Sequence, residues 1–126
     1  MRLLLDTHIL LWWLVDDPAL PSRARTLIAD PTNTVFISPL SLWEIAIKSR
    51  LGKIEANVDE VLAAATDGGL IPLPFTAGHA SETARLPYHH RDPFDRGLVA
   101  QARHEPMRLL THDGVVAAYG DSVLLV

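Results

Sequence analysis

The sequence predicts an α/β fold with a mainly parallel central sheet, and three observations support this prediction. Short runs of Leu, Ile and Val alternate along the chain with segments of helical periodicity. These runs are continuously apolar, as in strands that helices cover on both faces. The 126 residues, 48% of them hydrophobic, match one domain with one core. We therefore expect a single domain over residues 1–126.

Five apolar runs are expected to form the sheet. They read RLLL, TVFIS, LIPL, MRLLT and SVLLV, at residues 2–5, 34–38, 70–73, 107–111 and 122–126. Parallel strands bring their carboxyl ends to one edge of the sheet, where the ligands of such folds bind. The residues that follow each strand are therefore the first candidates for function.

Capping residues, prolines and glycines mark helices between the strands. Ser38 with Pro39 is an N-cap followed by proline at the first helical position, and Asn57 with Glu60 has capping-box spacing. The expected helices begin at Thr7, Ser22, Ser38, Asn57, Thr76 and Asp92 and end near Leu14, Asp30, Gly52, Gly68, Leu86 and Arg103, with a short one from Asp113 to Tyr119.

The composition excludes several classes of protein. No cysteine is present, which rules out disulfides and thiolate metal sites. A formal net charge of −4 argues against a broadly basic surface for nucleic acid, although nine of the eleven basic residues are arginine and suit local phosphate contacts. Asp6 and His8 interrupt the apolar start of the chain, and no apolar run has the length of a membrane span. We therefore expect a soluble cytoplasmic protein.

Two aspartates follow predicted strands. Asp6 comes directly after LLL, and Asp113 closely follows RLLT. If the strands are parallel, both lie at the same edge of the sheet. Taken singly, each is more typical of a helix cap or a turn than of a functional site.

Glu44 lies within an apolar stripe of its predicted helix. Leu40, Trp43, Ile47 and Leu51 have the spacing of a buried face, and Glu44 falls among them. A buried carboxylate is costly unless it is paired or binds a metal. Pairing with Lys48 one turn later, or a place at the edge of the stripe, are the alternatives.

The stretch RDPFDRGL contains two aspartates with different predicted roles. Asp92 before Pro93 is typical of a helix N-cap. Asp95 in the first turn is favoured by the helix dipole, but it also heads the apolar stripe of Leu98 and Val99. The dipole explains why an acid is tolerated at this position but not why it should face inward.

Four carboxylates at one edge of a sheet would repel one another. At an effective dielectric of ~20, each pair ~4 Å apart costs about 4 kcal/mol. A divalent cation removes this cost, and oxygen ligands without a Cys or His cluster suit Mg²⁺ or Mn²⁺. Such a site can activate water and stabilise an in-line displacement at phosphorus.

Four segments resemble the acidic motifs of the PIN-domain family, most closely its VapC-type toxins of type II toxin–antitoxin systems. They read LLLDTHILLWWL, SPLSLWEIAIK, RDPFDRGLVAQA and LLTHD, occur in the family's order and span nearly the whole chain. The resemblance implies a three-layer α/β/α sandwich, a Mg²⁺-dependent endoribonuclease, a homodimer and inhibition by a cognate antitoxin. It assigns the acidic site to Asp6, Glu44, Asp95 and Asp113.

Within this resemblance, Asp6 and Asp95 are the expected direct metal ligands, and Asp113 is less certain because the family varies at that position. Glu44 is expected to bind the metal through water or to orient the attacking water. Further polar residues could hold waters or position phosphate, or could equally be ordinary caps: Thr7, Ser38, Ser41, Thr111 and His112.

Two other functions remain open. A signalling receiver domain also has an acidic pocket on a parallel sheet, but it relies on a lysine late in the chain, and here the only lysines are Lys48 and Lys53. A non-catalytic interaction module would use the acids only to bind an ion.

Three further expectations concern the surface. Phosphate contacts are expected from Lys48, Arg50, Lys53, Arg91 and Arg96. The tryptophans are expected to pack in the core or a dimer face, with LLWWL near the start as the candidate dimer surface. The pair His89–His90 is interpreted as a loop feature, with a substrate-facing role as the alternative.

Overall fold

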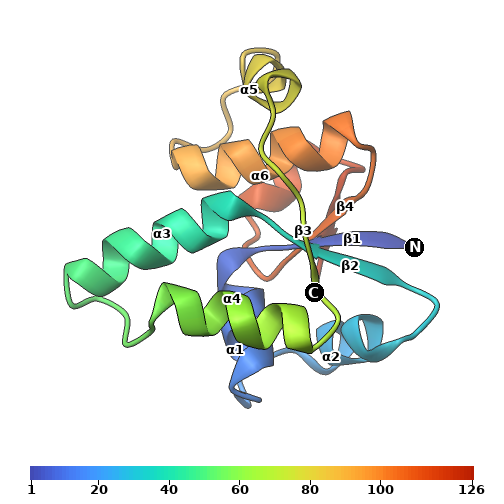
Figure 1. Cartoon of the computed structure of the whole chain (residues 1–126). Helices are drawn as coiled ribbons and strands as arrows, with labels where there is room; N and C mark the ends of the chain where they lie inside the picture. Colours follow the sequence, from blue (N-terminus) through green and yellow to red (C-terminus); the bar gives the residue numbers. More distant parts are fainter.

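The computed structural model describes residues 1–126 and has a five-stranded sheet between layers of helices (Figure 1). The strands are β1 (Arg2–Leu5), β2 (Thr34–Ile37), β3 (Ile71–Pro72), β4 (Arg108–Thr111) and β5 (Val123–Leu125). The helices are α1 (Thr7–Leu14), α2 (Ser22–Ala29), α3 (Pro39–Arg50), α4 (Val58–Asp67), α5 (Ala77–Thr83) and α6 (Pro93–His104), with the 3₁₀ helix η1 (Val116–Tyr119) before β5.

Every strand pair is parallel, and the strand order is β3-β2-β1-β4-β5. The central strand β1 pairs Leu4 with Phe36 of β2 and with Leu109 of β4. The predicted α/β class and parallel sheet are therefore confirmed. The carboxyl ends of β1, β2 and β4 all point to one edge, from which α1 and α3 begin.

Two apolar cores lie on opposite faces of the sheet. Leu3 and Leu5 of β1 point to the face covered by α1, α2 and α4, whereas Leu4 points to the face covered by α6 and η1. Figure 1 shows α5 and α6 above the sheet and α1, α2 and α4 below it. This is the expected α/β/α sandwich, with alternate residues of each strand facing opposite layers.

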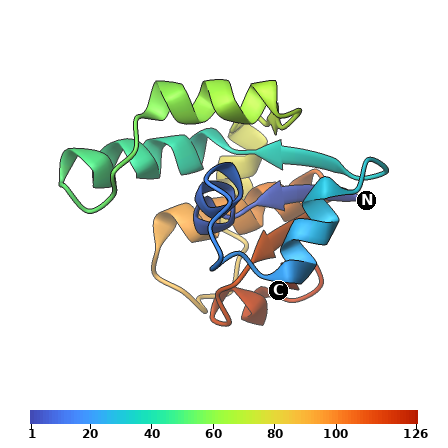
Figure 2. The ribbon, with the colours of Figure 1, turned by 90° about the horizontal axis from the view of Figure 1, so that it is seen from below.

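Helix α3 leads out of the sheet from the end of β2, and α4 lies beside it (Figure 2). The start of α3 also contacts α6. Gly97 of α6 allows the two helices to approach closely, because a Cβ at this position would collide with the Leu40 side chain. The close approach brings the first turn of α6 near the first turns of α3.

The predicted face of α3 was wrong. Trp43, Ile47 and Leu51 are 61%, 38% and 62% exposed, whereas the buried residues of this helix include Glu44 and Ile45. The helix therefore turns its row of large apolar residues outward. Spacing predicts which residues share a face, but only the neighbouring helices decide which face is covered.

Several predicted element ends also shift. The N-cap of α1 is Asp6 rather than Thr7, and α2 begins after Pro21 without a side-chain cap from Ser22. The caps at Ser38 and Asp92 are as predicted. The predicted strand at 70–73 pairs over two residues only, and the helix expected to reach Leu86 ends at Thr83. No helix combines the length and the apolar character that crossing a membrane requires.

Candidate metal centre

The carboxyl edge of the sheet holds a cavity of about 450 Å³ that is lined almost entirely by polar side chains. Asp6 reaches it from the end of β1, Glu44 from α3, Asp95 from α6 and Asp113 from the turn after β4. The structure thus brings all four sequence-predicted acids to one place. The cavity is lined by Asp6, His8, Trp12, Glu44, Lys48, His90, Asp92, Asp95, His112 and Asp113.

Asp6 is held by both of its carboxylate oxygens. Its Oδ1 accepts a hydrogen bond of 3.1 Å from the His8 N–H, which caps α1, and its Oδ2 accepts one of 2.5 Å from the Thr111 hydroxyl. The side chain is buried, and this burial raises the pKa of Asp6 even though the two hydrogen bonds oppose the shift. Asp6 is therefore rigidly oriented in a place that disfavours its charge.

Glu44 is only 4% exposed and has one satisfied oxygen. Its Oε2 lies 2.6 Å from the Lys48 Nζ, and this contact raises the pKa of Lys48. Its Oε1 is buried and has no hydrogen-bond partner. The predicted alternative of a pair with Lys48 is therefore present, yet one buried oxygen of this cavity-lining residue still lacks a donor.

Asp95 is the most strongly shifted acid. Burial, followed by the charges of Asp6 and Asp92, raises the pKa of Asp95 to about 7. Its Oδ2 lies 2.7 Å from the His90 Nε2, which opposes the rise. Asp92 does cap α6, because its Oδ1 accepts hydrogen bonds from the Phe94 and Asp95 amides.

Asp113 lies at the rim of the cavity. Its side chain is 45% exposed, and its Oδ1 accepts a hydrogen bond of 2.9 Å from the Val115 amide. Its Oδ2 is 4.0 Å from the His90 Nε2. His90, Asp95 and Asp113 together offer ligand atoms that lie within 4.8 Å of one another.

These residues fit a hard divalent cation. The donors are carboxylate oxygens, Glu44 Oε1 is buried without a partner, and burial, followed by the charges of Asp6 and Asp92, raises the pKa of Asp95 and so disfavours its charged form. A cation would give Glu44 Oε1 a partner and would favour the charged form of Asp95. Oxygen donors of this kind favour Mg²⁺ or Mn²⁺.

The polar residues around the acids connect the strands to the helices. Thr111 donates to Asp6 and accepts from the Asp113 amide, so it links two acids directly. The Thr7 hydroxyl donates to the Ser41 hydroxyl at 3.0 Å. Ser38 caps α3, and His112 packs its ring edge against Trp12 and bonds to the Val126 carbonyl. Thr111 is thus the one of the five in direct contact with an acid.

His8, Trp12 and Asp92 line the cavity although no place in the site was predicted for them, and His90 lines it in agreement with the alternative of a substrate-facing role. His8 follows the capping residue Asp6, which is the signal that could have placed it near the site. Trp12 lies one turn further along the same helix face, with its ring 5.9 Å from that of His8. His90 had no local signal, because its place depends on a loop that contacts remote residues.

The five predicted basic residues separate into three groups, the last of which includes the exposed Lys53. Lys48 lines the cavity. Arg96 is engaged elsewhere, since its guanidinium donates to the Pro87 and Thr83 carbonyls and to the Tyr119 hydroxyl. Arg91 and Arg50 are exposed. Lys48 is therefore the cation already at the site, and Arg96 supports the surrounding structure.

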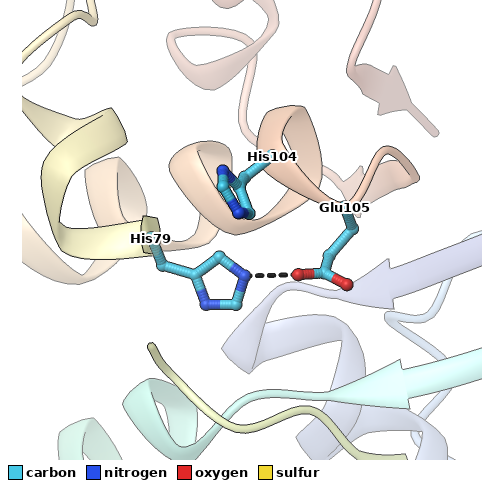
Figure 3. Close-up of side chains that lie close together, drawn as sticks. All are labelled: His79, His104 and Glu105. Carbon is cyan, nitrogen blue, oxygen red and sulfur yellow. Dashed lines mark hydrogen bonds and ion pairs between the residues drawn. The ribbon is translucent and has the colours of Figure 1, made fainter. Parts of the chain in front are cut away.

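A second cluster, of His79, His104 and Glu105, lies where α5 meets the end of α6 (Figure 3). The His79 Nδ1 accepts the Thr76 N–H, so its Nε2 carries the hydrogen and donates to Glu105 Oε2 at 2.5 Å. Because Nε2 carries the hydrogen, it has no lone pair with which to bind a cation. The cluster therefore caps α5 and ties it to α6.

Comparisons with known proteins identify a family and a shared fold. The family model described as PIN domain matches residues 3–121. The crystal structure of VapBC2 from Rickettsia felis, bound to a DNA fragment from their promoter, contains a chain that is 17% identical, with a TM-score of 0.69 over 100% of this chain and 98% of that one.

Two further structures are similar. FitAcB from Neisseria gonorrhoeae matches at 18% identity and a TM-score of 0.59 over 96% and 95% of the two chains. FitAB bound to an IR36 DNA fragment matches at 19% identity and a TM-score of 0.61 over 98% and 94%. At these identities the structures show a shared fold. The comparison with curated proteins gives no match.

Proposed function

The chain belongs to the PIN-domain family, and on that premise we propose that it is a Mg²⁺-dependent endoribonuclease that hydrolyses RNA phosphodiester bonds. The observation that carries the proposal is the convergence of Asp6, Glu44, Asp95 and Asp113 on one polar cavity at the carboxyl edge of the sheet. Four acids from four different segments have no shared structural role at this place. Mn²⁺ is the alternative cofactor.

In the proposed mechanism, Asp6 and Asp95 would hold a divalent cation, and the hydrogen bond from Thr111 fixes the Asp6 carboxylate for this task. Such a cation would supply a lowered pKa for a water molecule and positive charge beside the scissile phosphate. Asp113, at the rim, completes the site from the solvent side.

Glu44 has a separate role in the proposal. Its unpartnered Oε1 would accept a hydrogen bond from the attacking water and so orient it, or would bind the metal through water. Lys48 neutralises the other oxygen and lies at the cavity wall, where the phosphate of the substrate would enter. This pairing leaves one oxygen of Glu44 free while limiting the total negative charge that faces RNA.

The test is RNA cleavage by purified variants whose folding is verified by circular dichroism. Asp6→Asn and Asp95→Asn should each lower the cleavage rate at least ~100-fold, because each removes a charged ligand. Asp67→Asn, at the exposed end of α4, is the matched control and should cleave normally. Undiminished cleavage by folded Asp6→Asn would overturn the assignment. Metal binding without any cleavage by the wild type would favour the non-catalytic module.

Substrate binding should depend on salt. Because the formal net charge is −4, phosphate contacts must come from a local group such as Lys48, Arg50, Lys53 and Arg91. Each phosphate contact releases counterions, so the affinity for RNA should fall steeply with added salt. An affinity that stays constant as salt rises would contradict contact through the RNA backbone.

We further propose that the chain is the toxin of a type II toxin–antitoxin pair that acts in the cytoplasm. The motif resemblance to VapC-type toxins and the fold shared with chains of VapBC2 and FitAB support this. An arginine from a cognate antitoxin would pair favourably with these carboxylates. Expression of the wild type, but not of Asp6→Asn, should arrest growth, and co-expression of a small DNA-binding protein from the adjacent gene should relieve the arrest.

A homodimer is also part of the proposal. Trp12 and Trp13 of the expected LLWWL surface are half-buried against the core, whereas Trp43, Ile47 and Leu51 form an exposed row on α3. This row is the better candidate for the dimer face. Sedimentation velocity should give a dimer for the wild type and a monomer for Leu51→Glu, and a monomeric wild type would contradict the proposal.

A further inference from the structure

The loop of residues 84–92, between α5 and α6, carries His90 into the metal cavity. The His90 backbone N–H donates to the Tyr119 hydroxyl at 3.1 Å, and its side-chain Nε2 lies 2.7 Å from Asp95 Oδ2. Its Nδ1 accepts a hydrogen bond of 3.1 Å from the Arg91 amide. Backbone and ring are therefore both fixed.

The hydrogen bond at Nδ1 decides what the ring can do. Because Nδ1 accepts an N–H, the hydrogen of the imidazole is on Nε2, which donates to Asp95. Nε2 then has no lone pair for a cation. His90 is therefore a donor to a metal-binding carboxylate rather than a ligand.

A clamp formed by Arg96 and Tyr119 holds this loop. One terminal nitrogen of Arg96 donates to the Pro87 carbonyl and to the Tyr119 hydroxyl, each at 3.0 Å, and the other donates to the Thr83 carbonyl at 3.0 Å. The guanidinium also covers the Tyr88 ring, 4.7 Å from its centroid.

The Tyr119 hydroxyl is the centre of the clamp. It accepts hydrogen bonds from both Arg96 and the His90 N–H, and Tyr119 itself is buried. The start, middle and end of the loop are thereby tied to α6 and η1. Arg96 follows Asp95 directly, so one helical turn supplies both a metal-binding acid and the residue that positions its partner.

We propose that His90 is a positioning residue that holds Asp95 Oδ2 and so aims the other oxygen, Oδ1, at the cation, and that the Arg96–Tyr119 clamp keeps His90 in place. This rests on the proposed function only in taking Asp95 as a metal ligand. Hydrogen-bonding partners of metal ligands commonly change metal affinity ~10- to 100-fold when they are removed. Arg96, expected from the sequence to contact phosphate, acts on the site through the loop instead.

The test is calorimetric titration of the metal-free protein with Mn²⁺ in the absence of RNA. His90→Ala should weaken Mn²⁺ binding ~10- to 100-fold, whereas His90→Gln, which keeps an N–H near the position of Nε2, should stay within about threefold of the wild type. His89→Ala is the control, since His89 is an exposed neighbour in the same loop whose ring meets only the edge of Tyr119.

The clamp is tested by Tyr119→Phe, which removes the hydroxyl and leaves the ring. This variant should weaken Mn²⁺ binding in the same direction as His90→Ala. The double variant should bind no more weakly than His90→Ala alone, because both changes act through one hydrogen bond to Asp95. Fully additive losses would overturn the clamp.

Three results would overturn the role of His90. These are wild-type Mn²⁺ affinity in folded His90→Ala, equal losses in His90→Ala and His90→Gln, and no Mn²⁺ binding by the wild type. The failure of the proposed function has a different signature. Suppose that the wild type and its variants bind Mn²⁺ with the predicted order of affinities, but the wild type cleaves no RNA. This result would refute the nuclease proposal and leave His90 as the positioning residue.

Discussion

Asp95 is expected to lower the stability of the metal-free protein while it serves the proposed metal site. Its pKa is raised from 3.8 to about 7, and three pKa units correspond to about 4 kcal/mol as an upper limit. Asp95→Asn removes the charge while its amide oxygen still accepts from His90. We expect the variant to lose RNA cleavage and to gain about 1–3 kcal/mol in the free energy of unfolding at pH 8 without metal. Urea denaturation measures this, and a destabilised variant would contradict it.

Thr111 gives a test of how Asp6 is oriented. Its hydroxyl donates to Asp6 Oδ2 at 2.5 Å and lies in a buried position. Thr111→Val keeps the shape but removes the donor, so the pKa of Asp6 should rise further and Mg²⁺ affinity should fall ~10-fold.

Thr111→Ser keeps the hydroxyl and is the control for this change. It should retain Mg²⁺ affinity within about threefold of the wild type. Equal Mg²⁺ affinity in the Val and Ser variants, measured by calorimetry, would show that the hydrogen bond has no such role.

Local signals mark where the acids lie, but they favour caps or turns, and the order of the four motifs is what assigns the acids to one site. Asp6 and Asp113 follow apolar strands, and Asp95 heads an apolar stripe. The predicted burial of Glu44 is confirmed. The predicted burial of Trp43 beside it is wrong, because the two residues lie on different faces of α3. The position of His90 beside Asp95 could not be predicted, because it depends on Tyr119, 29 residues away.

Helix α6 begins with two aspartates that do different things. Both line the cavity, but Asp92 also caps the helix through Oδ1, whereas Asp95 bonds to His90. Asp92→Ala should lower the free energy of unfolding by about 0.5–2 kcal/mol, because two helical amides lose their acceptor. Asp92→Asn keeps the cap and should preserve both stability and most of the cleavage activity.

Chemical denaturation and the RNA cleavage rate separate these outcomes. If Asp92→Asn lost cleavage as completely as Asp95→Asn does, Asp92 would be a member of the site and not only a cap. If Asp92→Ala were as stable as the wild type, the cap would be unimportant to the fold.

The ends of the helices and strands show which features of the fold the local sequence can predict. The caps at Ser38, Asn57 and Asp92 were predictable because each side chain bonds to an amide two or three residues later. The start of α1 was off by one residue, since Asp6 and Thr7 are both good caps. Strand β3 is an edge strand, and only two residues of its apolar run are assigned to it, although the Leu73 amide that follows still donates to the Ile37 carbonyl.

The whole molecule should respond to pH through its acid cluster. Asp95 has a folded pKa of about 7 and an unfolded one near ~4, and the pKa of Asp6 is raised as well. The folded state then binds more protons than the unfolded state between those values, so stability of the metal-free protein falls as pH rises from about 4 to 7. Mg²⁺ should restore it, most strongly above pH 7.

Thermal unfolding from pH 5 to 8, with and without Mg²⁺, tests this. The gap in Tm between Asp95→Asn and the wild type should widen as pH rises in EDTA and shrink when Mg²⁺ is added. If the Tm of the two proteins changed equally with pH, the charge on Asp95 would not lower the stability of the protein, which would contradict this account.

The arrangement of the strands was beyond local reasoning. The parallel sheet followed from continuous apolar runs, but the order β3-β2-β1-β4-β5 depends on crossovers that no single segment encodes. That order places β1 at the centre, between β2 and β4, and so brings the residues that follow these three strands together. The site is a property of this topology.

The chemistry of the cleaved ends tests the proposal that the acid cluster directs water at RNA phosphorus. Purified wild type should cleave RNA only with Mg²⁺ or Mn²⁺ and leave 3′-hydroxyl and 5′-phosphate ends, as attack by water in line with the 3′ oxygen requires. Mapping the ends by mass spectrometry, with EDTA and folded Asp6→Asn as controls, decides it. Cleavage that persists in EDTA, or that leaves 2′,3′-cyclic phosphates from attack by the ribose hydroxyl, would contradict the proposed mechanism.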